Sequence, residues 1–352
     1  MRKYCVAKIG PIMESEIDEI PVVLMNLLNA TDQFNSLAKV LNSRTIDSVQ
    51  ILARGTSDNA AHFLKYLIEV KFGLPVGLSS PSSVTIYNSK LRLANTLVVA
   101  ISQSGQSNDL IEYATAAKAA GALLVSITND PNSPLARLGD SSIDICAGKE
   151  IAVAATKSYT AQLMACYLIV HFWLKIPYNI SNFESMINES KRLVENKDLV
   201  SDLVALLNRD DEIVVLGRGF SYANVRETAL KIQETSKIAV QGFSIADYMH
   251  GPISSLSVKS KVIIISPNKS PSSSIPENLT RIRELGAQII WIGSETIAES
   301  NDLVISGCNC NDEILANIVD TIAIQRLALD FARKNGLDPD NPAGLSKITF
   351  TR

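Results

Sequence analysis

Several features of secreted, membrane-spanning or nucleic-acid-binding proteins are missing from this sequence of 352 residues. The five cysteines are scattered and odd in number, and Cys308 and Cys310 lack zinc-finger spacing, so we expect a reduced, cytoplasmic protein. Charges nearly balance at −3 and no arginine-rich run occurs, which argues against a nucleic-acid partner. Residues 1–5 lack the apolar core of a secretory signal. The longest apolar run, residues 163–174, is too short to cross a bilayer, so no membrane contact is expected.

Strands and helices are predicted to alternate along the first half of the chain. The length leaves room for one large domain or two ordinary ones. Apolar residues at helical spacing predict helices within residues 11–43. Apolar runs predict strands at residues 49–53, near 76, at 97–102 and at 122–127, with helices between them. This alternation implies right-handed crossovers and a parallel sheet with helices on both faces.

The second half of the chain repeats the pattern of the first. Residues 156–207 are predicted to be mostly helical, and a strand and glycine turn at 213–221 then resemble residues 51–57. Gly219 follows Gly55, and Ser266 follows Ser102, at the same separation of 164 residues. Repeats in register indicate an internal duplication. We therefore predict an N-terminal helical segment (1–44), two α/β domains (45–180 and 181–335) and a C-terminal tail that closes the site (336–352).

The strand at residues 97–101 and the turn after it form a candidate anion site. The turn supplies hydroxyls, a side-chain amide and backbone N–H groups at the start of a helix; its residues of interest are Ser102, Gln103, Ser104, Gly105 and Ser107. Ligands of parallel sheets bind at this edge, and a helix N-terminus favours an anion such as phosphate. A glycine lets a ligand approach the backbone. Neither nucleotide-binding glycine motif occurs, and the same residues also suit an ordinary turn.

The second copy carries Pro267, Asn268 and Lys269 in place of this turn, and offers acid–base groups instead. Lys231 and Glu234 lie one turn apart on a predicted helix, and His250 precedes a Gly-Pro turn that can project it into a cleft. Lys347 lies in a tail whose proline and glycine predict an extended arm. Each group also has a simpler interpretation, as a surface glutamate, a loop histidine or a solvated lysine.

Together these motifs resemble the sugar isomerase (SIS) family over nearly the whole chain. Within it, they resemble the isomerase half of glucosamine-6-phosphate synthase and the stand-alone glucosamine-6-phosphate deaminases. The resemblance implies two tandem SIS domains, each a three-layer αβα unit. It implies a sugar-phosphate site formed by Gly55, Thr56, Ser57, Ser102, Gln103, Ser104, Gly105 and Ser107. It also implies that residues 150–157 line the sugar pocket, with the backbone near Val153 and Ala155 touching the ligand.

The resemblance also implies a role for each candidate acid–base group. Glu234 matches the base that moves a proton between C1 and C2, and Lys231 matches a lysine close to the sugar. His250 matches the ring-opening histidine that relatives contribute from the neighbouring subunit, which implies a homodimer. Lys347 matches the lysine that meets the open-chain carbonyl, electrostatically or as a Schiff base, and Ser346 beside it is expected to bind substrate.

The implied reaction converts glucosamine 6-phosphate to fructose 6-phosphate and ammonia, without a metal or an organic cofactor. Gln106 and Asp247 depart from the residues common in relatives, which leaves substrate choice open. Because residue 2 is Arg2 and no N-terminal glutaminase domain precedes the fold, we do not expect glutamine-dependent synthesis. Three alternatives stay open: phosphosugar isomerisation without deamination, cleavage of a phosphorylated fructosamine, and a non-catalytic sugar-phosphate sensor.

Overall fold

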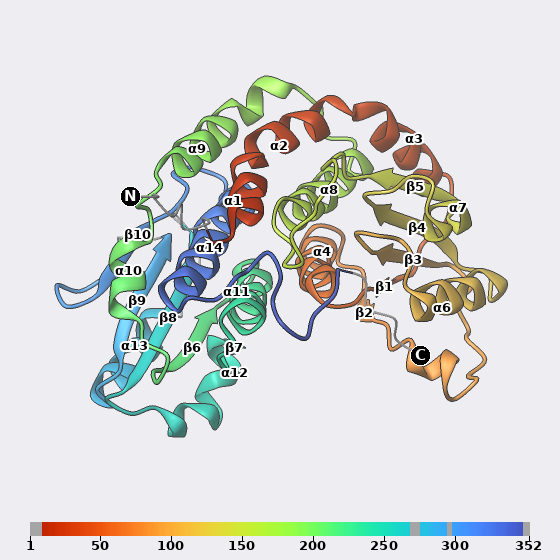
Figure 1. Ribbon diagram of the computed structural model, residues 1–352. Helices are drawn as coiled ribbons and strands as arrows, with labels where there is room; N and C mark the ends of the chain where they lie inside the picture. The colour runs from red at the N-terminus through yellow and green to blue at the C-terminus, as the bar shows by residue number, and fades with distance from the viewer. Residues whose placement is uncertain (1–8, 268–274, 294–297, 348–352) are drawn as a thin grey trace.

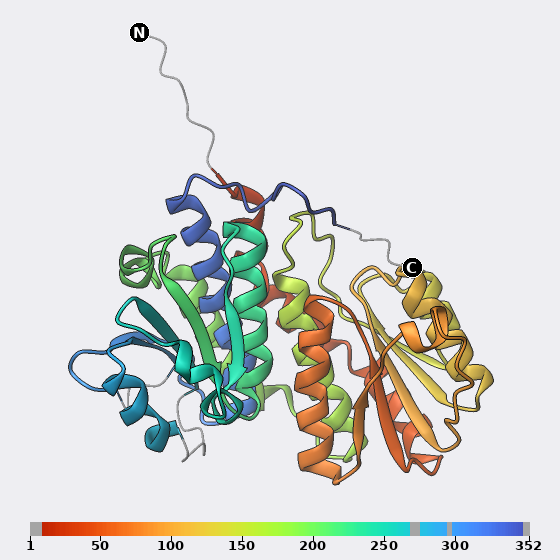
Figure 2. The ribbon, with the colours of Figure 1, turned by 90° about the horizontal axis from the view of Figure 1, so that it is seen from below.

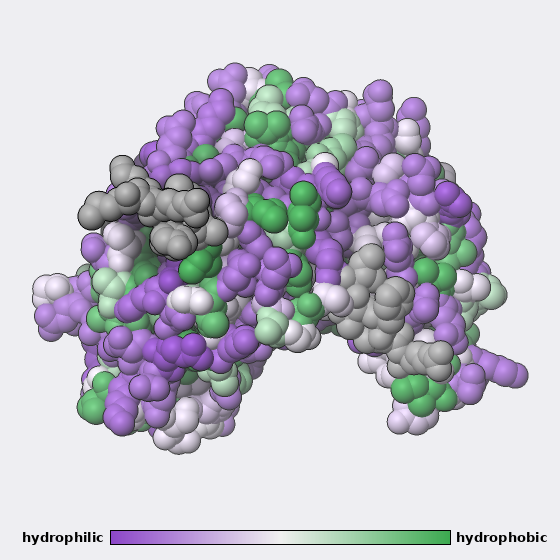
Figure 3. Space-filling view, in the orientation of Figure 1, coloured by the Kyte–Doolittle hydropathy of each residue, from purple (hydrophilic) through white to green (hydrophobic). Residues whose placement is uncertain are grey.

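The computed structural model describes residues 9–267, 275–293 and 298–347. The first eight residues, Asn268 and Lys269 of the second-copy turn, and residues 348–352 of the predicted tail lie outside the described residues. Among the helices in the described ranges, none combines the length and apolar character needed to cross a membrane. In Figure 3, the two halves form lobes separated by a hollow at the lower edge, and most of this face is hydrophilic.

The first half of the chain contains a five-stranded parallel sheet in the order β2-β1-β3-β4-β5 (Figure 1). Its strands are β1 (Ser48–Leu52), β2 (Val76–Leu78), β3 (Thr96–Ile101), β4 (Leu123–Thr128) and β5 (Ser141–Asp144). The helices up to the end of this half are α1 (Pro11–Asp18), α2 (Ile20–Asn29), α3 (Thr31–Asn42), α4 (Thr56–Phe72), α5 (Ser82–Thr85), α6 (Asn108–Ala119), α7 (Pro134–Leu138) and α8 (Lys157–Trp173).

The second half repeats this topology. Its sheet has the order β10-β9-β8-β6-β7, which is the order of the first sheet read from the opposite edge, and all its pairings are parallel. Its strands are β6 (Glu212–Gly217), β7 (Gln241–Ser244), β8 (Ser260–Ser266), β9 (Gln288–Gly293) and β10 (Leu303–Ser306). Its helices are η1 (Ile180–Phe183), α9 (Glu184–Glu195), α10 (Ser201–Leu206), α11 (Ser221–Ser236), α12 (Ile245–Met249), η2 (Pro252–Ser255), α13 (Ile275–Glu284) and α14 (Glu313–Lys334). The predicted pair of parallel-sheet α/β units is confirmed.

Strand β3 shows why these sheets are buried on both faces. Side chains alternate between the two faces of a strand. Leu97, Val99 and Ile101 enter the core that also contains α4 and α8, whereas Val98 and Ala100 enter a separate core against α6. All six residues of β3 are buried, as the unbroken apolar run predicts.

Helices α4, α8, α11 and α14 share one hydrophobic core with the inner faces of both sheets. Helices α4 and α11 follow β1 and β6, and they pack directly against each other (Figure 2). Because a helix that follows a parallel strand starts at the ligand-binding edge of its sheet, this packing brings the α11 side chains to the edge of the first sheet.

The described part of the tail after α14 has no helix or strand and crosses between the two halves (Figure 2). The Asp340 carboxylate accepts the N–H groups of Ile12 (2.9 Å) and Met13 (2.7 Å), which are donors without helical partners at the start of α1. The Asp340 carbonyl accepts the N–H of Val153. The tail therefore connects the N-terminal helix to the loop between β5 and α8.

A buried carboxyl on α14 predicts a pH-dependent stability. Burial raises the pKa of Asp320 to about 7, although its Oδ1 accepts the Cys308 N–H at 2.6 Å. The folded protein therefore holds a proton that the unfolded chain releases, so stability falls as pH rises from about 4 to 7, by about 4 kcal/mol at most. We expect Asp320→Asn to reduce the fall in Tm over this range, measured by calorimetry. Asp202→Asn, on an exposed position of α10, should keep the wild-type profile, and parallel curves for wild type and Asp320→Asn would contradict the prediction.

Candidate active site

A cavity of ≈ 400 Å³ lies where the edge of the first sheet meets α11 and the tail. A cavity of this volume suits a small molecule. Most of the predicted site residues line it: Gly55, Thr56, Ser57, Ser102, Gln103, Ser104, Ser107, Val153, Ala155, Lys231, Glu234, Ser346 and Lys347. It is also lined by Glu150, at the start of the segment 150–157 that was expected to line the pocket, and by Arg54 and Leu345, which the sequence analysis did not select. Gly105 and His250 are the predicted residues absent from this lining.

The turn between β3 and α6 is folded by its own hydroxyl groups. Ser102 Oγ accepts the Gly105 N–H at 3.1 Å, and Ser104 Oγ accepts the Gln106 N–H at 3.3 Å. The backbone N–H groups of Gln103, Ser104 and Ser107 have no acceptor in the part of the chain that the structure describes. Ser107 is the N-cap of α6 and the other two donors lie in the turn that leads to it, so the turn can bind an anion such as phosphate.

The reason for a glycine at position 105 differs from the predicted one. Gly105 has φ +61°, and a Cβ there would lie 2.2 Å from Ser133 Oγ rather than toward the cavity. Ser133 is the N-cap of α7, where its hydroxyl accepts the Ala136 N–H. Gly105 therefore allows close packing between the turn and α7, and it does not line the cavity.

The second turn of the site, residues 55–57, leads from β1 into α4. The Ser57 hydroxyl accepts a hydrogen bond from Gln162 Nε2 of α8 at 2.9 Å. Thr56 Oγ1 donates to the carboxylate of Glu227 on α11 at 3.2 Å. Both halves of the chain therefore hold this turn in place beside the anion-binding turn.

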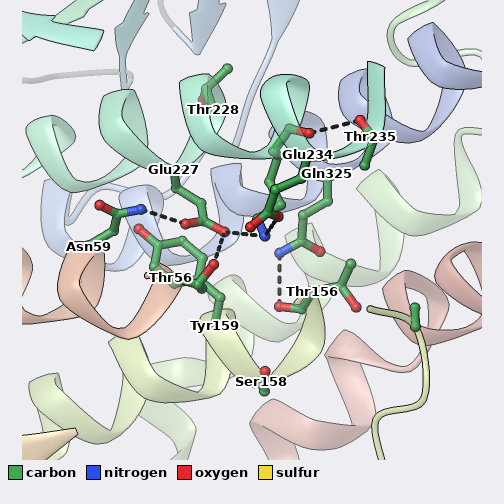
Figure 4. Close-up of polar contacts among 12 residues, drawn as sticks. Thr56, Asn59, Thr156, Ser158, Tyr159, Glu227, Thr228, Glu234, Thr235 and Gln325 are labelled. Atoms are coloured by element: carbon green, nitrogen blue, oxygen red, sulfur yellow. Dashed lines mark hydrogen bonds and ion pairs between the residues drawn. The ribbon is translucent and has the colours of Figure 1, made fainter. Parts of the chain in front are cut away.

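Helix α11 contributes a buried chain of charges to the cavity. Glu227, Lys231 and Glu234 lie one turn apart, on one face of the helix. Lys231 Nζ forms ion pairs with Glu234 and, at 3.6 Å, with Glu227. Asn59 Nδ2 also donates to Glu227 at 2.7 Å, and Figure 4 shows the Glu227 side chain directed toward Asn59 and Thr56. Lys231 and Glu227 are fully buried, whereas the Glu234 side chain is 23% exposed.

Burial and neighbouring charges shift the pKa values of Lys231 and Glu227. Burial lowers the pKa of Lys231, but the carboxylates of Glu227 and Glu234 raise it by more, so it lies above its usual value. Burial raises the pKa of Glu227, against the opposing effects of Lys231 and Asn59. The sequence analysis missed Glu227, although its spacing of one turn from Lys231 could have indicated it.

Glu150 organises the loop between β5 and α8. Its buried carboxylate accepts the N–H groups of Thr156 and Ser158, the Ser158 hydroxyl and, at 2.7 Å, the ammonium of Lys347. Lys347 Nζ also donates to the carbonyl of Ala152 at 2.6 Å. Burial raises the pKa of Glu150, but Lys347 and the N–H donors lower it below its usual value. The tail lysine is thus held at the cavity wall by a buried carboxylate.

His250 lies elsewhere on this chain. It follows α12, is exposed, and precedes Gly251 and η2. The single chain therefore does not bring His250 into the cavity that contains Glu234. Its role across a subunit boundary stays a prediction. Over the described ranges, no group of three or more histidine, cysteine, aspartate or glutamate side chains is placed to bind a metal ion.

Known proteins are similar to this chain in both sequence and fold. Residues 44–172 and 206–332 match the family model of the SIS domain. The chain is similar to glutamine–fructose-6-phosphate aminotransferase [isomerizing] of Gloeobacter violaceus, with 32% identity over 316 residues that cover 86% of this chain and 51% of that protein. The chain thus spans about half the length of the curated relatives it matches.

Two solved structures are similar over nearly the whole chain. A protein of Silicibacter pomeroyi DSS-3, provisionally named a phosphosugar isomerase, has TM-score 0.83 and 29% identity, covering 93% of this chain and 99% of that one. The C-terminal domain of glucosamine-fructose-6-phosphate aminotransferase from Francisella tularensis has TM-score 0.80 and 25% identity, covering 94% and 97%.

Packing at Gly105 predicts a difference between two glycine substitutions. Gly121 also has a positive φ, of +89°, but a Cβ there would meet nothing within 4 Å. Gly121→Ala should therefore cost only the backbone strain, about 1–2 kcal/mol. Gly105→Ala adds the clash with Ser133 and should lower the free energy of unfolding by more, measured by urea denaturation. Equal losses for the two variants would show that the turn does not pack tightly against α7.

Proposed function

The chain belongs to the SIS domain family, and on that premise we propose that it deaminates glucosamine 6-phosphate to fructose 6-phosphate and ammonia. The observation that carries the proposal is a single cavity with an anion-binding turn at residues 102–107 and an ion-paired carboxylate, Glu234, on α11. A phosphate bound at the turn fixes one end of a sugar and leaves its other carbons to the α11 side chains. Positioning of this kind lowers a reaction barrier by several kcal/mol.

The proposed reaction needs one base that serves two neighbouring carbons. After ring opening, for which we propose the partner's His250, the Glu234 carboxylate removes the proton from C2 and returns it to C1. The electron pair of the C2–H bond forms a C1=C2 double bond while the C1 carbonyl oxygen takes up a proton, which gives an enolamine. Protonation at C1 then draws the nitrogen lone pair into a C=N bond and gives a protonated imine at C2. Water adds to the imine and ammonia leaves, which yields fructose 6-phosphate. Lys231 holds the Glu234 carboxylate in position through their ion pair.

The geometry favours an electrostatic role for Lys347 over a Schiff base. Its ammonium is held by the buried Glu150 carboxylate at 2.7 Å and the Ala152 carbonyl at 2.6 Å. A Schiff base requires the amine to lose its proton and leave these acceptors. As an ammonium, Lys347 can stabilise negative charge on the oxygen of the open-chain sugar.

The similarity to known proteins supports amino-sugar chemistry. The Gloeobacter relative is named for fructose 6-phosphate, amino transfer and isomerisation together. Deamination of glucosamine 6-phosphate is a reaction at the same two carbons in the opposite direction. Water replaces the nitrogen at C2, and ammonia is released. Isomerisation without nitrogen loss is the second candidate, which the provisional name of the Silicibacter protein favours.

An ammonia-release assay tests the proposal. Wild-type protein should release ammonia from glucosamine 6-phosphate, and Glu234→Gln, which keeps the shape but not the base, should lower the rate at least about hundredfold. Glu112→Gln, at an exposed position of α6, is the matched control and should retain the wild-type rate.

The same assay separates the alternatives. Interconversion of aldose and ketose phosphates without ammonia would identify an isomerase, and release of an amino acid from a phosphorylated fructosamine would identify a deglycase. Binding of sugar phosphates with no turnover of any would favour a sensor. Wild-type turnover by Glu234→Gln would refute the role of that carboxylate.

The proposed contribution of His250 from a partner subunit predicts complementation. Glu234→Gln and His250→Ala should each be inactive alone. If each site takes its base and its histidine from different chains, hybrid dimers contain one intact site, and an exchanged equimolar mixture should recover about a quarter of the wild-type activity. No recovery, with subunit exchange verified by mass spectrometry of labelled chains, would show that the site is not shared.

A further inference from the structure

Arg54 adds a positive charge to the cavity that no other part of the proposed mechanism uses. It follows β1 and directly precedes the turn at residues 55–57, and it lines the cavity. Strand pairing places Leu52 opposite Ala100, so Arg54 and Ser102, each two residues beyond this pair and past the end of its strand, lie at the same edge of the sheet. The arginine is therefore at the end of the cavity that contains the anion-binding turn.

A buried carboxylate orients the Arg54 side chain. Its Nε donates to Asp109 Oδ2 at 2.9 Å, and Asp109 lies in the first turn of α6 with a side chain that is 2% exposed. The second oxygen of Asp109 accepts the Leu110 N–H at 2.9 Å. The guanidinium is thus held beside the N-terminus of the helix that follows the anion-binding turn.

The remaining donors of Arg54 are available to a ligand. A guanidinium carries its N–H groups in a fixed planar fork, and the contact with Asp109 uses only the one on Nε. In the described ranges the Nη groups have no acceptor, and the Arg54 side chain is 48% exposed. An arginine that served only to neutralise Asp109 would not need to leave these groups at the wall of a cavity. The fork matches the geometry of phosphate oxygens.

We propose that Arg54 is a phosphate-binding residue that donates its Nη N–H groups to the sugar phosphate. The inference rests on the proposed function and deepens it by naming the charge that selects phosphorylated sugars. The other cationic groups of the cavity, Lys231 and Lys347, are each held in an ion pair with a glutamate carboxylate. Asp109 pairs with Arg54 through Nε and leaves the outer face of the fork for the ligand.

Isothermal titration of the full chain with fructose 6-phosphate and with inorganic phosphate tests this assignment. Arg54→Gln should raise the Kd of both ligands about tenfold or more, because it removes charge-assisted hydrogen bonds to the phosphate. The dependence of Kd on salt should also become shallower. Arg54→Lys keeps a charge without the fork, so its affinities should fall between those of Arg54→Gln and wild type.

Arg218→Gln is the matched control. Arg218 precedes Gly219 at the equivalent place after β6, and it does not line the cavity, so both Kd values should remain those of wild type. Affinity for fructose without its phosphate should not differ among the variants.

The outcomes separate this inference from the proposed function. A wild-type chain that binds neither phosphate ligand would overturn both. Wild-type binding that is unchanged in Arg54→Gln, with only the Tm lowered, would overturn the assignment of Arg54 alone and leave it as a structural partner of Asp109. If Arg54→Gln does not fold, Arg54→Lys decides, and a phosphate affinity equal to that of wild type would overturn the proposal.

Discussion

The geometry of the cavity depends on the contacts of the buried Glu227 carboxylate. Burial of a charge is costly unless the charge is paired and hydrogen-bonded. Glu227 meets this condition with an ion pair to Lys231 on its own helix and hydrogen bonds from Thr56 and Asn59 of α4. Its partners thus come from both halves of the chain. A shift of α11 relative to α4 would leave the carboxylate buried without them, so the two helices are locked at one separation.

A second set of contacts fixes the opposite wall of the cavity. Glu16 of α1 accepts the N–H groups of Ile151 and Ala152, while Lys347 of the tail donates to Glu150 and to the carbonyl of Ala152. Burial raises the pKa of Glu16, against the lowering effect of its backbone donors. The loop after β5 thus depends on segments near both described ends of the chain. These contacts explain why the tail is part of the cavity wall although it has no regular structure.

The sequence predicts most of the fold and the site, and the exceptions share a physical cause. The run at 97–101 and the repeat that relates Gly55 to Gly219 predict the sheets, because strand burial and duplication leave local patterns. The contacts of Glu227 and Gly105 leave no local pattern in the sequence, because their partners are distant in the sequence or lie on another element. From the sequence, Glu227 would be expected at the surface of a charged helix, but its side chain is fully buried. The sequence pattern shows which residues could take part in acid–base chemistry or binding, but only the tertiary packing shows which neighbours they contact.

The duplication also raises the question of why only one half of the repeated structure carries the charges of the cavity. The offset of 164 residues that relates Gly55 to Gly219 places Phe63 and Leu67 of α4 at the positions of Glu227 and Lys231 on α11. Both α4 residues are buried and apolar. A second cavity, of ≈ 360 Å³, is lined by Leu67 and by residues at the start of α14. A cavity therefore lies beside each of the two helices, and the ion-paired carboxylates on α11 distinguish the one suited to proton transfer.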